Sequence, residues 1–289
     1  MKQCFAILVF ASALNSCSVD SNDSLDNSSL NQAPSSLEKI WESDTLLKGN
    51  ESVIYDELTD AIYVSCMGEM PDDALDGDGF IAKLNMDGSI DELQWVSGLN
   101  CPKGMAVYKN KLFVTDIGKL ITIDLLKGEI INSETIKGGE FLNDLDVDSD
   151  GSLFLTETRK NHILKHTNGK TELYYSTAEI GGLNGVHIHD ERILFTGSKG
   201  TNFLSNDLIV TPASTSIEGP DGIETYKNGY FGSSWKGKIY YFTENGDTKK
   251  MVDTWEQELY CADIDVIEDK NLLISPTLFN NKVIGYRIK

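Results

Sequence analysis

Six short segments of the chain each begin with a polar or small residue, and in five of them its side chain could take part in binding or chemistry. These positions, called slot residues below, recur at intervals of 37 to 52 residues and are Glu51, Lys103, Asn143, Asn184, Asp221 and Ala262. Carboxylate and amide oxygens are hard ligands that suit Ca²⁺, and also Mg²⁺, Mn²⁺ or, less readily, Zn²⁺. A fold that gathers the slot residues would therefore create a site for one divalent metal ion, with Ca²⁺ the first choice.

The interval between slot residues indicates the fold that would gather them. A period near 40 residues is typical of a four-stranded propeller blade. Each slot residue opens a stretch of alternating apolar residues, and a turn and a second strand follow, as at 148–151 and 152–156. A third strand follows, as at 79–84, and no segment has a sustained helical period. The sequence therefore predicts an all-β fold, a six-bladed β-propeller.

The two ends of the repeat array predict how the ring closes. The last repeat stops at a third strand, 283–289, while residues 40–47 have strand character and no partner in their own repeat. The N-terminal strand is therefore expected to supply the fourth strand of the last blade. That closure removes the exposed sheet edges.

In such a propeller the slot residues form a ring at one mouth of the central channel. Glu51 and Asp221 would repel each other there unless a cation lies between them. That cation could be a metal ion. It could also be the ammonium of Lys103, paired with Asp221 or Glu51 in a structural ion network that needs no metal.

The N-terminus has the pattern of an export signal. Lys2 precedes an apolar run at 4–14, which is too short to span a membrane as a helix. The following Leu14-Asn15-Ser16-Cys17 resembles the bacterial lipobox, which implies a lipid on Cys17. We expect a signal peptide at 1–16, a lipidated cysteine and flexible tether at 17–36, and the propeller at 37–289. The protein would be exported and lipid-anchored in the bacterial cell envelope, on the periplasmic or surface side.

The net charge limits the binding partners that we expect. The formal net charge is −20, which disfavours nucleic acid and anionic membrane surfaces, so we expect membrane contact only through the anchor. We also expect a monomer.

Three cysteines remain in the folded part of the chain. Removal of the signal and lipidation of Cys17 leave Cys66, Cys101 and Cys261. These form either one disulfide, with Cys66 and Cys101 as the suggested pair, or three buried thiols.

Four of the slot segments resemble motifs of the regucalcin–gluconolactonase family. Residues 51–55 are similar to its Glu-Gly-Pro-Val-Trp opening, and residues 142–144, 183–185 and 220–222 are similar to its Pro-Asn-Asp, Pro-Asn-Gly and Pro-Asp-Gly turns, in the same order. Members are six-bladed propellers with one divalent metal at the channel mouth, and many hydrolyse sugar lactones. The resemblance implies that Glu51, Asn184 and Asp221 bind the metal. It also implies that Asn143 contacts the substrate or the metal's water and that Asp221 acts as general base.

The chain departs from the family pattern at several positions. Val53 and Tyr55 replace the Pro and Trp of the opening, and Phe141 stands where sugar-lactone members have an Arg. An apolar side chain cannot hydrogen-bond sugar hydroxyls, which argues against a small polar sugar lactone. The expected partner is a small-molecule substrate, a lactone whose kind the sequence leaves open. Residues 67–79 are an insertion with five carboxylates, expected to form a solvated or lid-like loop without a second ion.

Two functions follow from these features. The first is a metal-dependent hydrolase that opens a lactone at the channel mouth. The second is a non-enzymatic propeller lipoprotein that binds a metal or ligand there. Second strands return to the same face, where Asp116, Glu157 and Trp235 are expected to be surface residues that close hairpins. The four histidines, His162, His166, His187 and His189, lie outside the slot positions, and we do not expect them to bind the metal.

Overall fold

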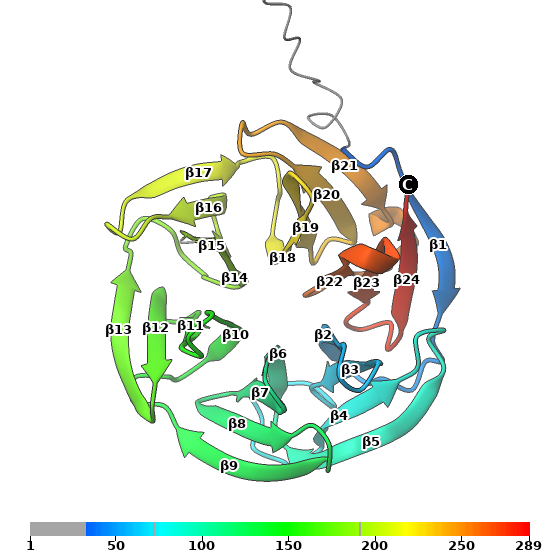
Figure 1. The fold of residues 1–289 in the computed structure, drawn as a ribbon, viewed down its shortest axis with the longest axis vertical. Coiled ribbons are helices and arrows are strands. Elements are labelled where there is room, and N and C mark those ends of the chain that lie inside the picture. The colour runs from blue at the N-terminus through cyan, green and yellow to red at the C-terminus, as the bar shows by residue number, and fades with distance from the viewer. Residues whose placement is uncertain (1–32, 72, 191) are drawn as a thin grey trace, which may run out of the picture. The chain divides into compact units, whose positions relative to one another are not determined.

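Six four-stranded antiparallel sheets surround a central channel in the computed structural model, which describes residues 33–71, 73–190 and 192–289 (Figure 1). The predicted six-bladed β-propeller is confirmed. Blades 1 to 5 follow the chain order from the channel outward: β2(Asn50–Asp56) to β5(Ile90–Leu99), β6(Pro102–Tyr108) to β9(Glu129–Thr135), β10(Leu142–Val147) to β13(Lys170–Ser176), β14(Val186–His189) to β17(Val210–Ser214), and β18(Pro220–Tyr226) to β21(Thr248–Asp253).

Between these innermost and outermost strands lie the two middle strands of each blade. They are β3(Ala61–Cys66), β4(Gly79–Leu84), β7(Lys111–Asp116), β8(Lys119–Asp124), β11(Leu153–Glu157), β12(His162–Thr167), β15(Arg192–Gly197), β16(Gly200–Leu204), β19(Gly229–Ser234) and β20(Lys238–Phe242). The 3₁₀ helix η2(Trp255–Gln257) follows blade 5, and η3(Glu268–Lys270) lies within blade 6.

The sixth blade is closed by the N-terminal strand, as predicted. It consists of β22(Asp265–Ile267), β23(Leu272–Pro276), β24(Val283–Ile288) and, outermost, β1(Leu37–Glu42). Leu37 lies opposite Ile288, so the strand begins a few residues before the expected 40–47. The backbone N–H of Lys289 donates to the Ser36 carbonyl at 3.1 Å. The two ends of the ring thus share one ladder and leave no open edge between first and last blade.

The apolar core lies between neighbouring blades. Because each blade stacks on the next, its middle strands are covered on both faces, and every residue of β3 is buried. Tyr63 of blade 1 packs with Leu112 and Val114 of blade 2, and its ring centroid lies 4.6 Å from that of Trp95. Burial of each such side chain contributes roughly 1.5–3 kcal/mol. Outer strands such as β9 are largely exposed.

Several expectations concern residues outside this description. The signal peptide, Cys17 and the first part of the expected tether fall within residues 1–32. No helix in the described part of the chain is long and apolar enough to cross a membrane. Cys66, Cys101 and Cys261 are buried thiols, and none forms a disulfide with another described cysteine, so the suggested Cys66–Cys101 bridge is wrong. Each thiol instead fills space as a small apolar side chain.

Candidate functional site at one mouth of the channel

The slot residues lie at irregularities in the innermost strands. The register of the first ladder shifts between Asn50 and Ser52, between Pro102 and Met105, between Leu142 and Leu145, and between Pro220 and Ile223. Such a bulge releases a residue from regular pairing and redirects its side chain. Asn184 lies two residues before the start of β14, and Ala262 lies three residues before the start of β22. The mouth that these residues surround is called the slot end below.

A set of buried hydroxyls fixes the backbone at the slot end. The second strand of each blade carries one near its end: Ser65, Thr115, Thr156, Thr196, Ser233 and Ser275. Thr196 Oγ1 accepts the Gly185 N–H at 2.7 Å and donates to the Asp221 carbonyl of the next blade at 3.0 Å. Thr156 makes the same pair of bonds, to Asp144 N–H and the Asn184 carbonyl. Thr115, Thr156 and Thr196 therefore tie a slot segment to the next blade. Ser65 and Ser233 instead bond to the backbone of their own blade, at Ser52 and Gly222.

Gly185 shows how closely adjacent blades approach at this level. A Cβ on this residue would lie 2.1 Å from the Asp221 carbonyl oxygen. Such contacts do not occur, so glycine is required for blades 4 and 5 to meet here. The hydroxyls were missed by sequence reasoning. Their signal was a Ser or Thr recurring at the end of every second strand.

The structure places the predicted slot residues in one electrostatic group. Glu51, Lys103, Asn143 and Asp221 are buried, with 4–6% of their surfaces exposed, and Asn184 is partly buried. Lys103 Nζ lies 3.9 Å from Glu51 Oε1 and donates toward Met67 Sδ at 3.2 Å. Burial and the nearby Glu51 raise the pKa of Asp221 well above its usual value, while Lys103 opposes the rise. The sixth slot residue, Ala262, is fully buried and adds no polar group.

Two acceptor oxygens at the slot end have no hydrogen-bond partner among the described residues. They are Asn143 Oδ1 and Asp221 Oδ1, and both are buried. Asn143 Nδ2 donates to Thr158 Oγ1 at 3.3 Å, which fixes the orientation of the amide. A buried polar atom without a partner costs about 1–3 kcal/mol, and a cation bound at the slot end would remove that cost for both oxygens. Buried carboxylate and amide oxygens of this kind fit a hard divalent cation.

The inserted loop spans part of the slot end. It leaves blade 1 at Met67, whose sulfur contacts Lys103. Further along, Asp73 pairs with Arg159 of blade 3 at 2.8 Å, and the Arg159 guanidinium lies 4.7 Å from the centroid of the Phe141 ring. Asp78 caps the loop's own backbone by accepting the Glu69 N–H at 2.9 Å. The loop thus bridges blade 1 to blade 3 by an ion pair.

Asp116 and Glu157 are not the surface residues that the sequence suggested. They are 2% and 0% exposed. Asp116 accepts the N–H of Cys101 at 2.7 Å, and Glu157 accepts the N–H of Phe141 at 2.8 Å and of Lys160 at 2.6 Å. Each carboxylate therefore holds the segment that leads into a slot residue. The third residue of that set, Trp235, is half-exposed at the slot end.

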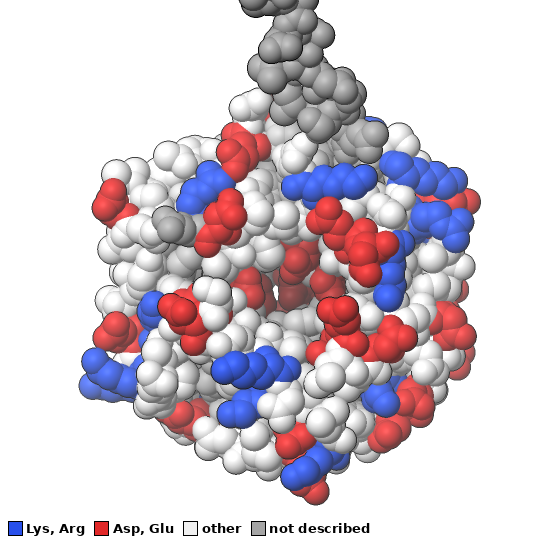
Figure 2. Space-filling model, in the orientation of Figure 1, with Lys and Arg blue, Asp and Glu red and all other residues white. Residues whose placement is uncertain are grey.

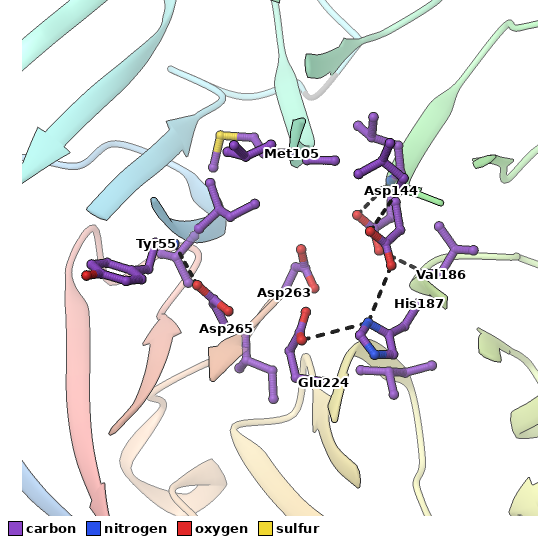
Figure 3. A pocket seen from close by; sticks show the side chains of 17 residues that line it. Tyr55, Met105, Asp144, Val186, His187, Glu224, Asp263 and Asp265 are labelled. Atoms are coloured by element: carbon purple, nitrogen blue, oxygen red, sulfur yellow. Dashed lines mark hydrogen bonds and ion pairs between the residues drawn. The ribbon is translucent and has the colours of Figure 1, made fainter. Parts of the chain in front are cut away.

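The opposite mouth of the channel, called the far end below, contains a cavity of about 260 Å³ that the sequence analysis did not predict. Figure 2 shows acidic side chains around and inside the central opening. In Figure 3 several carboxylates face the cavity, and the full set is Asp144, Asp146, Glu224, Asp263 and Asp265. Burial raises the pKa of each, to about 6 for Asp146 and Asp265.

Most far-end carboxylates bond to backbone. Asp144 accepts the Val186 N–H at 2.9 Å, Asp146 accepts the Ile188 N–H at 2.7 Å, and Asp265 accepts the Tyr55 N–H at 2.6 Å. Each of these bonds joins the innermost strands of adjacent blades, which lack ladder partners on that side. These carboxylates therefore link the innermost strands of neighbouring blades along the channel wall.

The histidines do not form a cluster. His187 lies at the far end, where its Nε2 is 2.7 Å from Thr225 Oγ1, while His166 Nδ1 is 2.9 Å from Thr171 Oγ1 on another blade. Burial, with His189 nearby, lowers the pKa of His187 to about 4. The carboxyl groups of Asp146 and Glu224 lie within 4 Å of His187 Nδ1, but their own pKa values are raised, so both are protonated before the pH reaches the value at which His187 takes up a proton. They therefore do not counteract the lowering of the His187 pKa by burial.

Within the described residues, no three His, Cys, Asp or Glu side chains converge closely enough to hold a metal ion. A cation at the slot end would therefore depend on two carboxylates, Glu51 and Asp221, with amide oxygens beside them. At the far end, Asp144, Asp146 and Asp265 accept from backbone N–H groups and Asp263 accepts from the Ser52 hydroxyl, whereas the slot end retains the two partnerless oxygens. For this reason the slot end is the candidate functional site.

Fold and site define a class: a six-bladed β-propeller with a ring of polar side chains at one channel mouth. No protein-family model matches the chain, and no curated protein matches it by sequence. Its fold is similar to that of solved propeller enzymes. A streptogramin B lyase has a TM-score of 0.62 at 15% identity, covering 88% of this chain and 97% of the other. A catalytically inactive virginiamycin B lyase from Staphylococcus aureus, solved with quinupristin, has a TM-score of 0.58 at 15% identity over 88% and 99%.

A gluconolactonase from Xanthomonas campestris has a TM-score of 0.63 at 13% identity, covering 87% of each chain. At these identities the likeness shows the fold alone.

Proposed function

We propose that the protein is a metal-dependent hydrolase that opens a lactone at the slot end. The observation that carries this proposal is the pair of buried oxygens without partners, Asn143 Oδ1 and Asp221 Oδ1, in a group that includes Glu51. Membership of the regucalcin–gluconolactonase family, which the slot motifs suggest, is part of the same proposal. The gluconolactonase among the structural neighbours is compatible with it.

Four of the slot residues then have definite roles. Glu51, Asn184 and Asp221 would hold one divalent ion, Ca²⁺ in the first instance. Such an ion polarises a carbonyl and lowers the pKa of a bound water. Asp221 would also accept the proton of the attacking water as general base, because its buried carboxylate lies in the same group as Glu51. Asn143, held at its Nδ2 by Thr158, presents its Oδ1 to the substrate or the water.

The wall formed by blades 2 and 3 suits the developing negative charge of an opening lactone. Phe141 replaces the arginine of sugar-lactone enzymes, but Lys103 Nζ lies 5.2 Å from its ring centroid and Arg159 lies 4.7 Å from it. The cationic character of this wall is therefore supplied by neighbours of Phe141. An apolar ring in place of a hydrogen-bond donor favours an aliphatic or aromatic lactone over a sugar lactone.

The setting of the protein is proposed from its sequence. The lipobox-like segment before Cys17 supports export and anchoring in the bacterial envelope, with a small molecule as the partner and a monomer as the working unit. The acidic net charge argues against nucleic acid.

The second candidate is a binding propeller without catalysis. The buried contact between Lys103 and Glu51 favours it, because that pair already neutralises one carboxylate. The test is hydrolysis of γ-butyrolactone and dihydrocoumarin by the full chain, before and after chelation, beside Asp221→Asn. Turnover that chelation abolishes, that Ca²⁺ restores and that the variant lacks supports the hydrolase. Metal binding without turnover supports the binding propeller, and absence of both refutes the proposed site.

A further inference from the structure

Four aromatic side chains at the slot end form a continuous row in which each ring contacts the next. This row is called the aromatic rim below. Successive ring centroids lie 5.9, 5.9 and 5.3 Å apart along Trp235, Trp255, Tyr260 and Phe279. Trp235, Trp255 and Phe279 are 41%, 41% and 48% exposed. Large aromatic side chains are expensive to leave in contact with water, and contiguous exposed apolar surface usually marks a binding site.

The aromatic rim follows the ring from Asp221 to Glu51. The Trp235 N–H donates to the Gly219 carbonyl at 3.2 Å, and a Cβ on Gly219 would lie 2.2 Å from the indole Nε1. This tryptophan therefore lies directly on the segment that leads into Asp221. At the other end, Leu278, next to Phe279, forms a β-bridge with Asn50, which precedes Glu51. The rim thus lines the side of the mouth formed by blades 5 and 6.

Hydrogen bonds hold the loops that carry the rim. Thr254 Oγ1 donates to the carbonyls of Gly237 and Leu259, each at 2.9 Å, which fixes η2 against the β19–β20 hairpin. Asn280 accepts the Tyr260 N–H at 3.0 Å and donates to the Glu258 carbonyl at 3.0 Å. The rings are therefore held in place before any ligand arrives, which lowers the entropy lost on binding.

The two sides of the mouth differ in character. Blades 2 and 3 contribute the cationic side chains Lys103 and Arg159, whereas the aromatic rim contributes exposed apolar rings. Within the rim, each ring meets the next nearly edge-on, at 82–86°. Such an alternating surface offers ridges and grooves to an alkyl or aryl group, whereas a sugar ring needs one flat face.

We propose that the aromatic rim is the subsite for an apolar acyl or aryl substituent of the lactone, an inference that rests on the proposed function of the slot end. The reactive carbonyl would lie among the slot residues, and the substituent would extend over blades 5 and 6. The rim would then determine specificity by favouring substituted lactones over small unsubstituted ones.

The test compares γ-butyrolactone with γ-dodecalactone on the full chain. In Trp255→Ala and Phe279→Ala, kcat/KM for the long lactone should fall roughly 10- to 100-fold, and for the short lactone by less than about threefold. The control, Leu126→Ala, removes an exposed apolar side chain between β8 and β9 and should change neither. Equal losses on both lactones, or no loss on either, would overturn the subsite.

Binding separates failure of the subsite from failure of the proposed hydrolysis. Quenching of tryptophan fluorescence by γ-dodecalactone should saturate with the parent and require at least about tenfold more ligand with Phe279→Ala. If the parent opens no lactone but shows this difference, the rim stands and the hydrolase proposal fails. If parent and Phe279→Ala bind equally, or neither binds, the rim proposal is refuted.

Discussion

Thr196→Val should destabilise the propeller, whereas Thr201→Val should not. The two threonines lie opposite each other on β15 and β16, and both are fully buried. Thr196 Oγ1 accepts from Gly185 N–H at 2.7 Å and donates to the Asp221 carbonyl at 3.0 Å, but Thr201 Oγ1 has no hydrogen-bond partner among the described residues. Valine has nearly the same shape, so each change removes a hydroxyl and little else.

The expected changes in the free energy of unfolding follow from the buried groups that each substitution leaves without a hydrogen-bond partner. Thr196→Val leaves a buried N–H and a buried C=O without this partner, at about 1–3 kcal/mol for each group that stays unsatisfied, so a loss of about 2–6 kcal/mol is expected. Thr201→Val removes a hydroxyl that is already buried without a partner and should be neutral or stabilising by about 1 kcal/mol. For a domain of this size 1 kcal/mol corresponds to roughly 2–4 °C in Tm.

Urea unfolding followed by circular dichroism measures the difference directly. The midpoint should fall clearly for Thr196→Val and stay or rise for Thr201→Val, with the same m value in both. Because Thr196 also holds the backbone of Asp221 and lies beside Asn184, its variant should bind divalent metal more weakly. Equal shifts in the two variants would refute the assignment of the Thr196 hydroxyl as a tie between blades 4 and 5.

Two further predictions concern the charged groups of the channel. Lys103→Met should strengthen Ca²⁺ binding by roughly tenfold, because it removes a competing cation 3.9 Å from Glu51. If the site is instead an ion network that needs no metal, the same substitution should lower Tm, and added Ca²⁺ should not restore it. His187→Gln should reduce the loss of stability on acidification. Burial lowers the pKa of His187 from 6.5 to about 4 in the folded protein. The free energy of unfolding is therefore unaffected by His187 above about pH 6.5 and decreases by at most about 3 kcal/mol as the pH falls toward 4. Parallel curves of unfolding free energy against pH for parent and variant would contradict this.

The repeat register accounts for what the sequence could predict. Six slot residues at near-regular spacing were enough to predict the blade count and the proximity of Glu51, Lys103 and Asp221, and the unpaired strands at the two ends predicted the closure by the N-terminal strand. These features depend on periodicity, which a single sequence displays. The Lys103–Glu51 contact was also among the expected alternatives, because both residues occupy equivalent positions in adjacent blades.

Other features depend on contacts between blades, which periodicity does not specify. Asp116 and Glu157 looked like exposed turn residues, but each accepts backbone N–H groups from the preceding loop. The far-end carboxylates bond across blades at separations of 42 residues or more, as Asp144 does with Val186. The aromatic rim joins residues of three separate loops, so only the folded chain reveals it.

The central claim is that the slot residues bind one divalent metal ion. Equilibrium dialysis of the full chain against Ca²⁺, followed by elemental analysis, measures this directly beside Glu51→Gln and the control Glu57→Gln, which alters an exposed glutamate of the same blade. We predict one ion per chain for the parent and for Glu57→Gln, and a large loss for Glu51→Gln. A parent without bound metal, or equal metal content in all three proteins, would contradict the account.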